Sequence, residues 1–210
     1  MKTIIMVRHG ESETNVTRVF TGQLDVPLTA TGREQARRMA EYMDKYRVDK
    51  MYASPLQRAM DTAKAIAARQ NCTIEEADAL MEVYAGSWQG LPFEEIAEKF
   101  SEIYQVWRAD IGSAVTTDGE SCQQLYDRVT GFFEKVLTEP EETVCLVCHA
   151  TPIRMIESYI KAGCVKVAQE IPWVPNASVT VYQYDGAFHE VERGTSHFMG
   201  DLLSKLPTTI

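Results

Sequence analysis

The tetrapeptide Arg8-His9-Gly10-Glu11 directly follows the short apolar run Thr3-Ile4-Ile5-Met6-Val7. A β-branched apolar run of this length predicts a buried strand, which places the arginine and the histidine at its C-terminal end. In open α/β sheets, ligands bind at that edge. Arginine offers a planar fork of donors suited to phosphate, and histidine offers a ring nitrogen that can attack it. The tripeptide alone is also compatible with an ordinary exit from a strand into a loop.

The rest of the chain alternates between predicted strands and helices. We expect strands at 3–7, 49–53, 73–77 (a weak edge strand) and 143–148, and helices at 35–46, 54–70, 93–108, 121–137 and 152–162. Capping-box spacing precedes two of the helices, at Thr31–Glu34 and Ser121–Gln124. Segments 178–184 and 188–193, joined at Asp185-Gly186, predict a hairpin.

This order predicts a three-layer α/β/α fold with a mostly parallel central sheet and a C-terminal β-hairpin. We expect a single domain over residues 1–210, in which a helical segment around 91–120 forms a lid-like insertion. No repeat, linker or low-complexity tract divides the chain.

Composition limits the partners and the location of the protein. The net charge of -9 argues against nonspecific binding to nucleic acid or to an anionic membrane, so an anionic substrate needs a local basic pocket. The initial apolar run is too short for a signal-peptide core, and no run approaches the length that spans a membrane. We therefore expect a cytoplasmic protein. The sequence gives no indication of its oligomeric state.

The five cysteines do not suggest a disulfide framework. Cys145-Leu146-Val147-Cys148-His149 matches the C-x-x-C-H pattern of c-type haem attachment and also resembles a redox pair. However, the pattern lies in an apolar run that predicts a central strand, where cysteine behaves as a small buried hydrophobe. We expect core cysteines and no haem.

Further motifs follow the initial tetrapeptide in a fixed order. They are Asn15, Thr21-Gly22-Gln23-Leu24-Asp25 with Pro27-Leu28-Thr29, Gly32, Gln35-Ala36, Ser54-Pro55-Leu56-Gln57-Arg58-Ala59 with Thr62-Ala63, Glu82 with Gly86, Trp88 and Gly90, and His149. From residue 3 to about residue 156, this chain resembles the histidine phosphatase superfamily, the phosphoglycerate mutase-like enzymes. The resemblance implies the fold of that family.

The resemblance also implies a covalent phosphohistidine route. In that route His9 is the nucleophile, and Arg8 and Arg58 hold the nonbridging phosphoryl oxygens. His149 is a second donor, and Glu82 protonates the leaving alkoxide and then activates water.

A phosphate cradle completes the implied site. Its members are Asn15, Thr21, Gly22 and the backbone N–H of Ala150, which stands where many family members carry glycine. His189 and His197 lack motif context and are given no role. The acidic residues lack a D-x-D or H-E-x-x-H arrangement, and two arginines and two histidines already supply positive charge. We expect neither a metal nor a cofactor.

The branch of the family follows from the residue after Glu82. Mutases of the family carry arginine there and an arginine-rich insertion, whereas this chain has Val83 and only Lys99 and Arg108 as cations between residues 99 and 119. It resembles the phosphatase branch, which includes broad-specificity, sugar-bisphosphate and α-ribazole phosphatases. We therefore expect a small-molecule phosphate ester, such as a sugar phosphate or α-ribazole phosphate, as the substrate.

Two alternatives stay open, a cofactor-dependent phosphoglycerate mutase and a noncatalytic phosphoester-binding module. The second predicts loss of His9 or Glu82, and both are present. The aromatic residues Trp88, Phe93, Trp107 and Trp173 are compatible either with a pocket lining or with the core, and their spacing favours the core.

Overall fold

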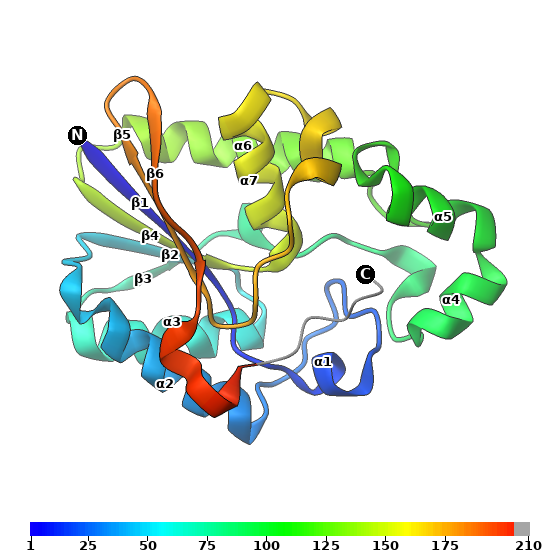
Figure 1. Cartoon of the computed structure of the whole chain (residues 1–210), viewed down its shortest axis with the longest axis horizontal. Helices are drawn as coiled ribbons and strands as arrows, with labels where there is room; N and C mark the ends of the chain where they lie inside the picture. Colours follow the sequence, from blue (N-terminus) through cyan, green and yellow to red (C-terminus); the bar gives the residue numbers. More distant parts are fainter. Residues whose placement is uncertain (204–210) are drawn as a thin grey trace.

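The centre of the fold is a six-stranded sheet with the order β3-β2-β4-β1-β5-β6 (Figure 1). The structure is a computed structural model that describes residues 1–203. β1 (Lys2–Arg8), β2 (Lys50–Ala53), β3 (Ile74–Glu76) and β4 (Thr143–Cys148) run parallel. β5 (Val179–Tyr184) joins β1 antiparallel and forms a hairpin with β6 (Phe188–Thr195). The mostly parallel sheet, the short edge strand β3 and the C-terminal hairpin confirm the predicted fold class.

Helices cover both faces of the sheet. α2 (Ala30–Tyr42) and α3 (Gln57–Gln70) lie on one face, and α6 (Cys122–Thr138) and α7 (Ala150–Ala162) on the other (Figure 1). α4 (Phe93–Lys99) and α5 (Ser101–Ala109) lie beyond the sheet, as does the short helix α1 (Glu13–Thr17) (Figure 1). No helix among residues 1–203 is both long enough and apolar enough to cross a membrane.

Alternate residues of the central strands supply two separate cores. In β1, Ile4 and Met6 belong to the core under α6 and α7, whereas Ile5 and Val7 belong to the core under α2 and α3. All four side chains are fully buried. This explains why the strand reads as a continuous apolar run: a parallel strand with helices on both faces buries both of its faces.

The same alternation separates the two cysteines of the C-x-x-C-H pattern. Cys145 packs in the core of α2 and α3, and Cys148 packs in the opposite core. Burial raises the pKa of both thiols. Because two residues three apart in a strand point to opposite faces, these thiols cannot act as one attachment site or redox pair. The prediction that they are core residues is confirmed.

Several helix boundaries differ from the prediction. The capping box expected at Thr31–Glu34 is wrong, because α2 begins earlier and Thr29 caps it by accepting a hydrogen bond from Gly32 N at 2.9 Å. The single helix expected over 93–108 is interrupted at Phe100, whose φ of -127° and ψ of 38° are not helical. Phe100 packs against Trp88 there, a tertiary contact without a local sequence signal. The helix expected from residue 152 begins at Ala150.

Two more helix ends differ: α2 ends at Tyr42 and is followed by the 3-10 turn Met43–Lys45, and α3 begins at Gln57, three residues after the expected start. The predicted start of α6 and end of α7 are confirmed. α6 carries the expected capping box between Ser121 and Gln124. α7 ends at Gly163, whose φ of 64° is left-handed and therefore suits glycine.

β1 and β4 are parallel neighbours in the sheet, and the connections that follow them run to opposite faces. The chain leaves β1 toward the face of α2, and it leaves β4 toward the face of α7. The loops therefore part at the C-terminal ends of these two strands and leave a crevice, which is where ligands bind in open α/β sheets. His9 and His149 immediately follow the two strands.

Candidate active site

His9 is held at the exit of β1 by the backbone. Its N–H donates to the carbonyl of Cys148 at 3.0 Å, and its own carbonyl accepts from Ala177 N at 3.0 Å. Gly10 follows because two backbone segments meet there, and a Cβ at this position would lie 2.4 Å from the carbonyl oxygen of Gly32. The imidazole is thus fixed at the edge of the sheet and almost fully buried.

The ring nitrogens of His9 have distinct roles. Nδ1 lies 2.6 Å from the carbonyl oxygen of Gly10. Because a carbonyl only accepts hydrogen bonds, Nδ1 carries the proton and Nε2 keeps its lone pair. Burial, followed by the positive charges of Arg58 and Arg8, lowers the pKa of His9 well below its ordinary value. The result is a neutral imidazole with a nucleophilic Nε2 at neutral pH.

His149 lies beside His9 at the exit of β4. The centroids of the two rings are 5.0 Å apart and their planes are inclined by 58°. His149 Nε2 is 2.8 Å from Ser54 Oγ, whereas Nδ1 is buried without a partner among the described residues. Burial and the charge of Arg58 lower the pKa of His149 well below its ordinary value. No role for Ser54 was expected.

Arg8 and Arg58 bring two positive charges to the same place. Arg8 Nη1 donates to the carbonyl of Val174 at 2.6 Å, and Arg58 donates to the carbonyls of Leu24 and Gly22 at 2.8 Å each. Burial lowers the pKa of each guanidinium to about 10, so both remain charged at neutral pH. These hydrogen bonds fix the side chains without neutralising them, because carbonyls are uncharged. Two fixed, buried cations beside His9 form an anion site.

Glu82 reaches the site from the loop after β3. Its Oε1 accepts from its neighbour Val83 N at 2.8 Å, and its Oε2 lies 3.4 Å from Thr151 N in the first turn of α7. The carboxylate raises the pKa of both Arg8 and Arg58 against the larger effect of burial. The structure therefore brings Arg8, His9, Arg58, Glu82 and His149 together, as the sequence predicted.

A cavity of about 160 Å³ opens at these residues. The predicted cradle residues Asn15, Thr21, Gly22 and Ala150 all line it, together with Arg8, His9, Arg58 and Glu82. His149 lies behind this lining, in contact with the His9 ring.

Aromatic side chains form another part of the lining. Phe93, Trp107 and Trp173 line the cavity, whereas Trp88 is fully buried in the core between Phe20 and Tyr104. Trp88 is thus a core residue, and Trp107 both belongs to the core and lines the cavity, whereas Phe93 and Trp173 are only partly buried against the core. α4 and α5 bring Phe93 and Trp107 to the cavity, which is the placement expected of a lid. Movement of the 91–120 segment stays a prediction.

Asn176 is a site residue that the sequence did not reveal. Its Nδ2 lies 3.1 Å from Asn15 Oδ1, 3.2 Å from the His9 carbonyl and 3.4 Å from the Gly10 carbonyl. Asn15 Oδ1 also accepts from Ser12 N at 3.0 Å. Asn176 thus connects the segment before β5 to the nucleophile loop. It stands in a stretch without a motif, so no local pattern indicated it.

Arg18 and Glu11 add a cation and an anion to the cavity lining, and neither had an expected role. Arg18 follows α1 with a left-handed φ of 56°, and its guanidinium forms an ion pair with Glu94 at 3.7 Å. Lys99, one of the two cations counted in the 99–119 stretch, pairs with Glu95 at 2.5 Å and does not line the cavity. Within residues 1–203, no three His, Cys, Asp or Glu side chains are grouped so as to hold a metal ion.

Comparison with known proteins shows one family. The profile of the histidine phosphatase superfamily (branch 1) matches residues 4–195. Phosphoserine phosphatase 1 of Hydrogenobacter thermophilus is 36% identical over 155 residues, which cover 73% of this chain and 74% of the relative. Phosphoglycerate mutase-like protein 4 of Arabidopsis thaliana is 34% identical over 191 residues, which cover 87% and 80%.

Solved structures with a similar fold superpose on most of this chain. Bacillus stearothermophilus YhfR superposes with a TM-score of 0.88 at 25% identity, over 94% of this chain and all of that one. A mycobacterial glucosyl-3-phosphoglycerate phosphatase in complex with VO3 superposes with a TM-score of 0.83 at 28% identity, over 90% and 97%.

Proposed function

The chain belongs to the histidine phosphatase superfamily, and from this premise we propose that it hydrolyses small phosphomonoesters through a phosphohistidine intermediate. The observation that carries this proposal is the tautomer of His9. The Gly10 carbonyl holds the proton on Nδ1, so Nε2 has a lone pair beside the buried guanidiniums of Arg8 and Arg58. A nucleophile and two cations at one point are what transfer of a phosphoryl group needs.

In the first step, His9 Nε2 attacks phosphorus and the bond from phosphorus to the ester oxygen breaks. The leaving alkoxide takes a proton from the protonated carboxyl group of Glu82. Arg8 and Arg58 stabilise the charge on the nonbridging oxygens, and the backbone N–H of Ala150, at the start of α7, faces the same anion.

In the second step, the Glu82 carboxylate accepts a proton from water while the water oxygen attacks phosphorus. The bond from phosphorus to His9 Nε2 breaks, inorganic phosphate leaves, and both residues return to their starting protonation states. Glu82 lines the same cavity as Arg8, His9 and Arg58, in contact with the first turn of α7, which suits both proton transfers.

Val83 supports a hydrolase over a mutase. It occupies the position that is arginine in the resembling mutases, and its side chain is buried in the core, 1% exposed. Besides the phosphate-holding Arg8 and Arg58, the cavity lining includes Arg18, which is paired with Glu94. A mutase must hold its substrate firmly while phosphoryl groups pass between it and the phosphohistidine, whereas a hydrolase needs only to admit water.

A second candidate is a more specific phosphatase that acts on an amino-acid phosphate such as phosphoserine. Arg18 and Glu11, both at the cavity, match the carboxylate and the ammonium group of such a substrate. A relative that is 36% identical is named phosphoserine phosphatase. A panel of phosphate esters that includes phosphoserine, glycerol phosphate and sugar phosphates distinguishes the candidates by kcat/KM.

The direct test of the proposed route is to trap the intermediate. Rapid acid-free quenching with labelled p-nitrophenyl phosphate should place one phosphoryl group on His9. His9→Ala should fold and lose at least ~10³-fold in kcat, because a residue of a catalytic unit dominates the rate. Near-normal turnover by His9→Ala would exclude the mechanism, and phosphate trapped on another residue would reassign the nucleophile.

A further inference from the structure

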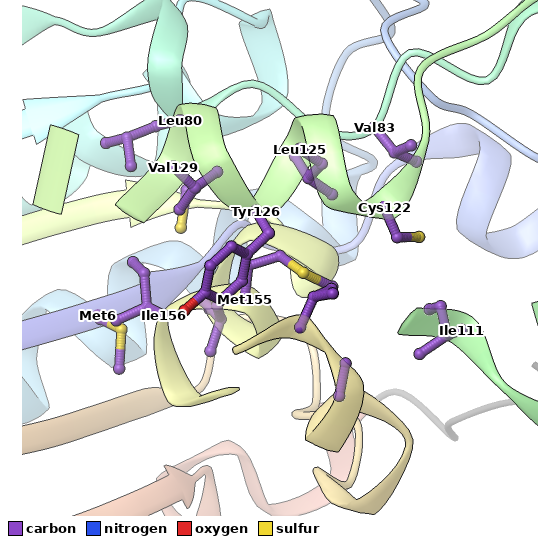
Figure 2. Close-up of a cluster of buried hydrophobic side chains, with 14 of the residues drawn as sticks. Met6, Leu80, Val83, Ile111, Cys122, Leu125, Tyr126, Val129, Met155 and Ile156 are labelled. Carbon is purple, nitrogen blue, oxygen red and sulfur yellow. The ribbon is translucent and has the colours of Figure 1, made fainter. Parts of the chain in front are cut away.

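The loop that carries Glu82 is fixed to α6 by apolar side chains on both sides of the carboxyl group. Leu80 and Val83 are buried, and they belong to the same core as Leu125 and Val129 of α6 (Figure 2). These contacts hold the loop against the helix. They do not fix the backbone of Glu82 itself, which lies between the two buried side chains.

Arg128 of α6 holds the loop by its carbonyls. Its Nη1 donates to the carbonyls of Ala79 at 2.9 Å and Met81 at 3.0 Å, with that of Asp78 at 3.4 Å. Its Nη2 lies 3.4 Å from the carbonyl of Glu82. One guanidinium thus gathers the carbonyls that end the 3-10 turn Asp78–Leu80 and lead into Glu82. The Asp78 carbonyl also accepts from Met81 N at 3.0 Å within the turn, and a guanidinium that spans the carbonyls beyond it sets the path of the chain.

Glu120 holds the other side of the loop and Arg128 at once. Its Oε1 accepts from Tyr84 N at 2.8 Å and from Arg128 Nη2 at 2.6 Å. Its backbone N–H donates to the carbonyl of Tyr84 at 2.8 Å. The ion pair is mostly buried, with side chains 24% and 16% exposed. Residues 81–84 are therefore held from both ends by one ion pair whose members lie on or next to α6.

The backbone decides where the carboxyl group of Glu82 lies, because Oε1 is bound to the next N–H of the chain, that of Val83. We infer that Arg128 and Glu120 are positioning residues that place the Glu82 carboxyl group for proton transfer to the leaving oxygen. This inference rests on the proposed role of Glu82 as the proton carrier. Arg128 and Glu120 do not line the cavity, so they act through Glu82 rather than on the substrate.

Leaving-group dependence separates this role from a purely structural one. An alkyl alkoxide needs a proton as it departs, whereas p-nitrophenolate leaves with little help. In single-turnover measurements, Arg128→Met should slow release of alcohol from an alkyl phosphate about 10- to 100-fold more than release of p-nitrophenolate, the size expected when a catalytic group is misplaced by about 1 Å. A general loss of folded protein would slow both substrates alike. Arg128→Lys should show a smaller difference between the losses for the two substrates than Arg128→Met does.

A double variant tests whether the effect passes through Glu82. In a Glu82→Gln background, Arg128→Met should add no further selective loss for the alkyl ester, because the group it positions is gone. Additive selective losses, or equal losses for the two substrates in Arg128→Met, would overturn the inference. Should Arg128→Met fail to fold, Glu120→Gln takes its place, and we expect the same selective loss for the alkyl ester. An unchanged ratio of the rate for the alkyl ester to the rate for p-nitrophenyl phosphate would count against the inference.

Two controls keep this test distinct from that of the proposed function. Arg37→Met removes a bidentate Arg–Glu pair on α2, in which Arg37 Nε donates to Glu34 Oε2 at 2.8 Å and Nη2 to Oε1 at 2.7 Å. This variant should leave the ratio of the rates for the alkyl ester and p-nitrophenyl phosphate unchanged. Glu82→Gln alone reports on the proposed function. If it shows no selective loss, Glu82 is not the proton carrier and the positioning role fails with it, while the phosphohistidine route is decided separately by trapping on His9. If it does and Arg128→Met does not, only the positioning role fails.

Discussion

The Cζ atom of Arg154 lies 3.6 Å from the centroid of the Trp173 ring. Arg154 is buried, donates to the carbonyl of Ile171, and keeps its charge because its pKa, lowered by burial, stays at about 10. A desolvated guanidinium against an indole is a favourable cation–π arrangement. Trp173 therefore lines the cavity in a position that is fixed by its contact with Arg154.

We expect Trp173→Ala to weaken binding of aromatic esters more than of small polar ones. KM for p-nitrophenyl phosphate should rise about 10-fold, from loss of a stacking surface of order 1 kcal/mol or more, while KM for glycerol phosphate changes little. Steady-state kinetics on both esters check this. Trp88→Phe, a change at a core residue that does not itself line the cavity, is the control. Equal shifts of both KM values would show that Trp173 does not contact the leaving group.

Glu82→Gln should slow alkyl phosphates far more than p-nitrophenyl phosphate, provided that phosphorylation of His9 limits the rate. Arg58→Ala should depress both substrates, since stabilisation of the phosphoryl charge does not depend on the leaving group. Burst kinetics establish which step limits. Equal losses in Glu82→Gln, with phosphorylation limiting, would rule Glu82 out as the acid.

Hydrolysis should greatly exceed phosphoglycerate mutase activity, because Val83 is apolar and buried where the resembling mutases carry arginine. A coupled assay that follows the interconversion of 3- and 2-phosphoglycerate should stay near background, while p-nitrophenyl phosphate is cleaved readily. Efficient interconversion with negligible phosphate release would reverse this assignment.

Activity should survive removal of metal ions. The guanidiniums of Arg8 and Arg58 supply the positive charge that the phosphoryl group requires, and both remain charged when buried. After dialysis against a strong chelator, kcat with p-nitrophenyl phosphate should match that of untreated enzyme. A loss restored by Mg²⁺ or Mn²⁺ would point instead to the carboxylates as ligands.

Folding stability should fall as the pH drops below about 6.5, because His9 and His149 resist protonation in the folded state. The unfolded chain binds those protons at the ordinary histidine pKa, so protons favour unfolding below that value. Each group contributes up to about 1.4 kcal/mol per pH unit to the free energy of unfolding in this range. Denaturant titrations at a series of pH values give the free energy of unfolding as a function of pH. Below pH 6.5 this free energy should fall less steeply with decreasing pH in His9→Gln than in the wild type. The same pH dependence in both proteins would contradict the lowered pKa.

The fold and the residues expected to act on the phosphoryl group could be predicted because their signals are local. Continuous apolar runs indicate strands buried on both faces, and His9 and His149 each follow one directly. Ser54, Asn176 and Arg128 carry no such signal. Their contacts join residues 95, 161 and 46 positions apart, so only the folded chain reveals them. The helix break at Phe100 has no local signal either, because the contact of Phe100 with Trp88 forms only in the folded chain, whereas the local pattern predicts an uninterrupted helix.

The position of β4 in the sheet has a consequence for how the protein acquires activity during synthesis. β4 lies between β1 and β2, yet it is made some ninety residues after β2. Until it emerges from the ribosome, β1 and β2 have no native partner in common, and His9 lacks both the Cys148 carbonyl that anchors its N–H and the neighbouring His149. A nascent chain that ends before β4 thus carries the nucleophile but not the site. β4 therefore joins the parallel strands and brings His149 to His9, and the later residues Val174, Asn176 and Ala177, which hold Arg8 and His9, complete the site only afterwards.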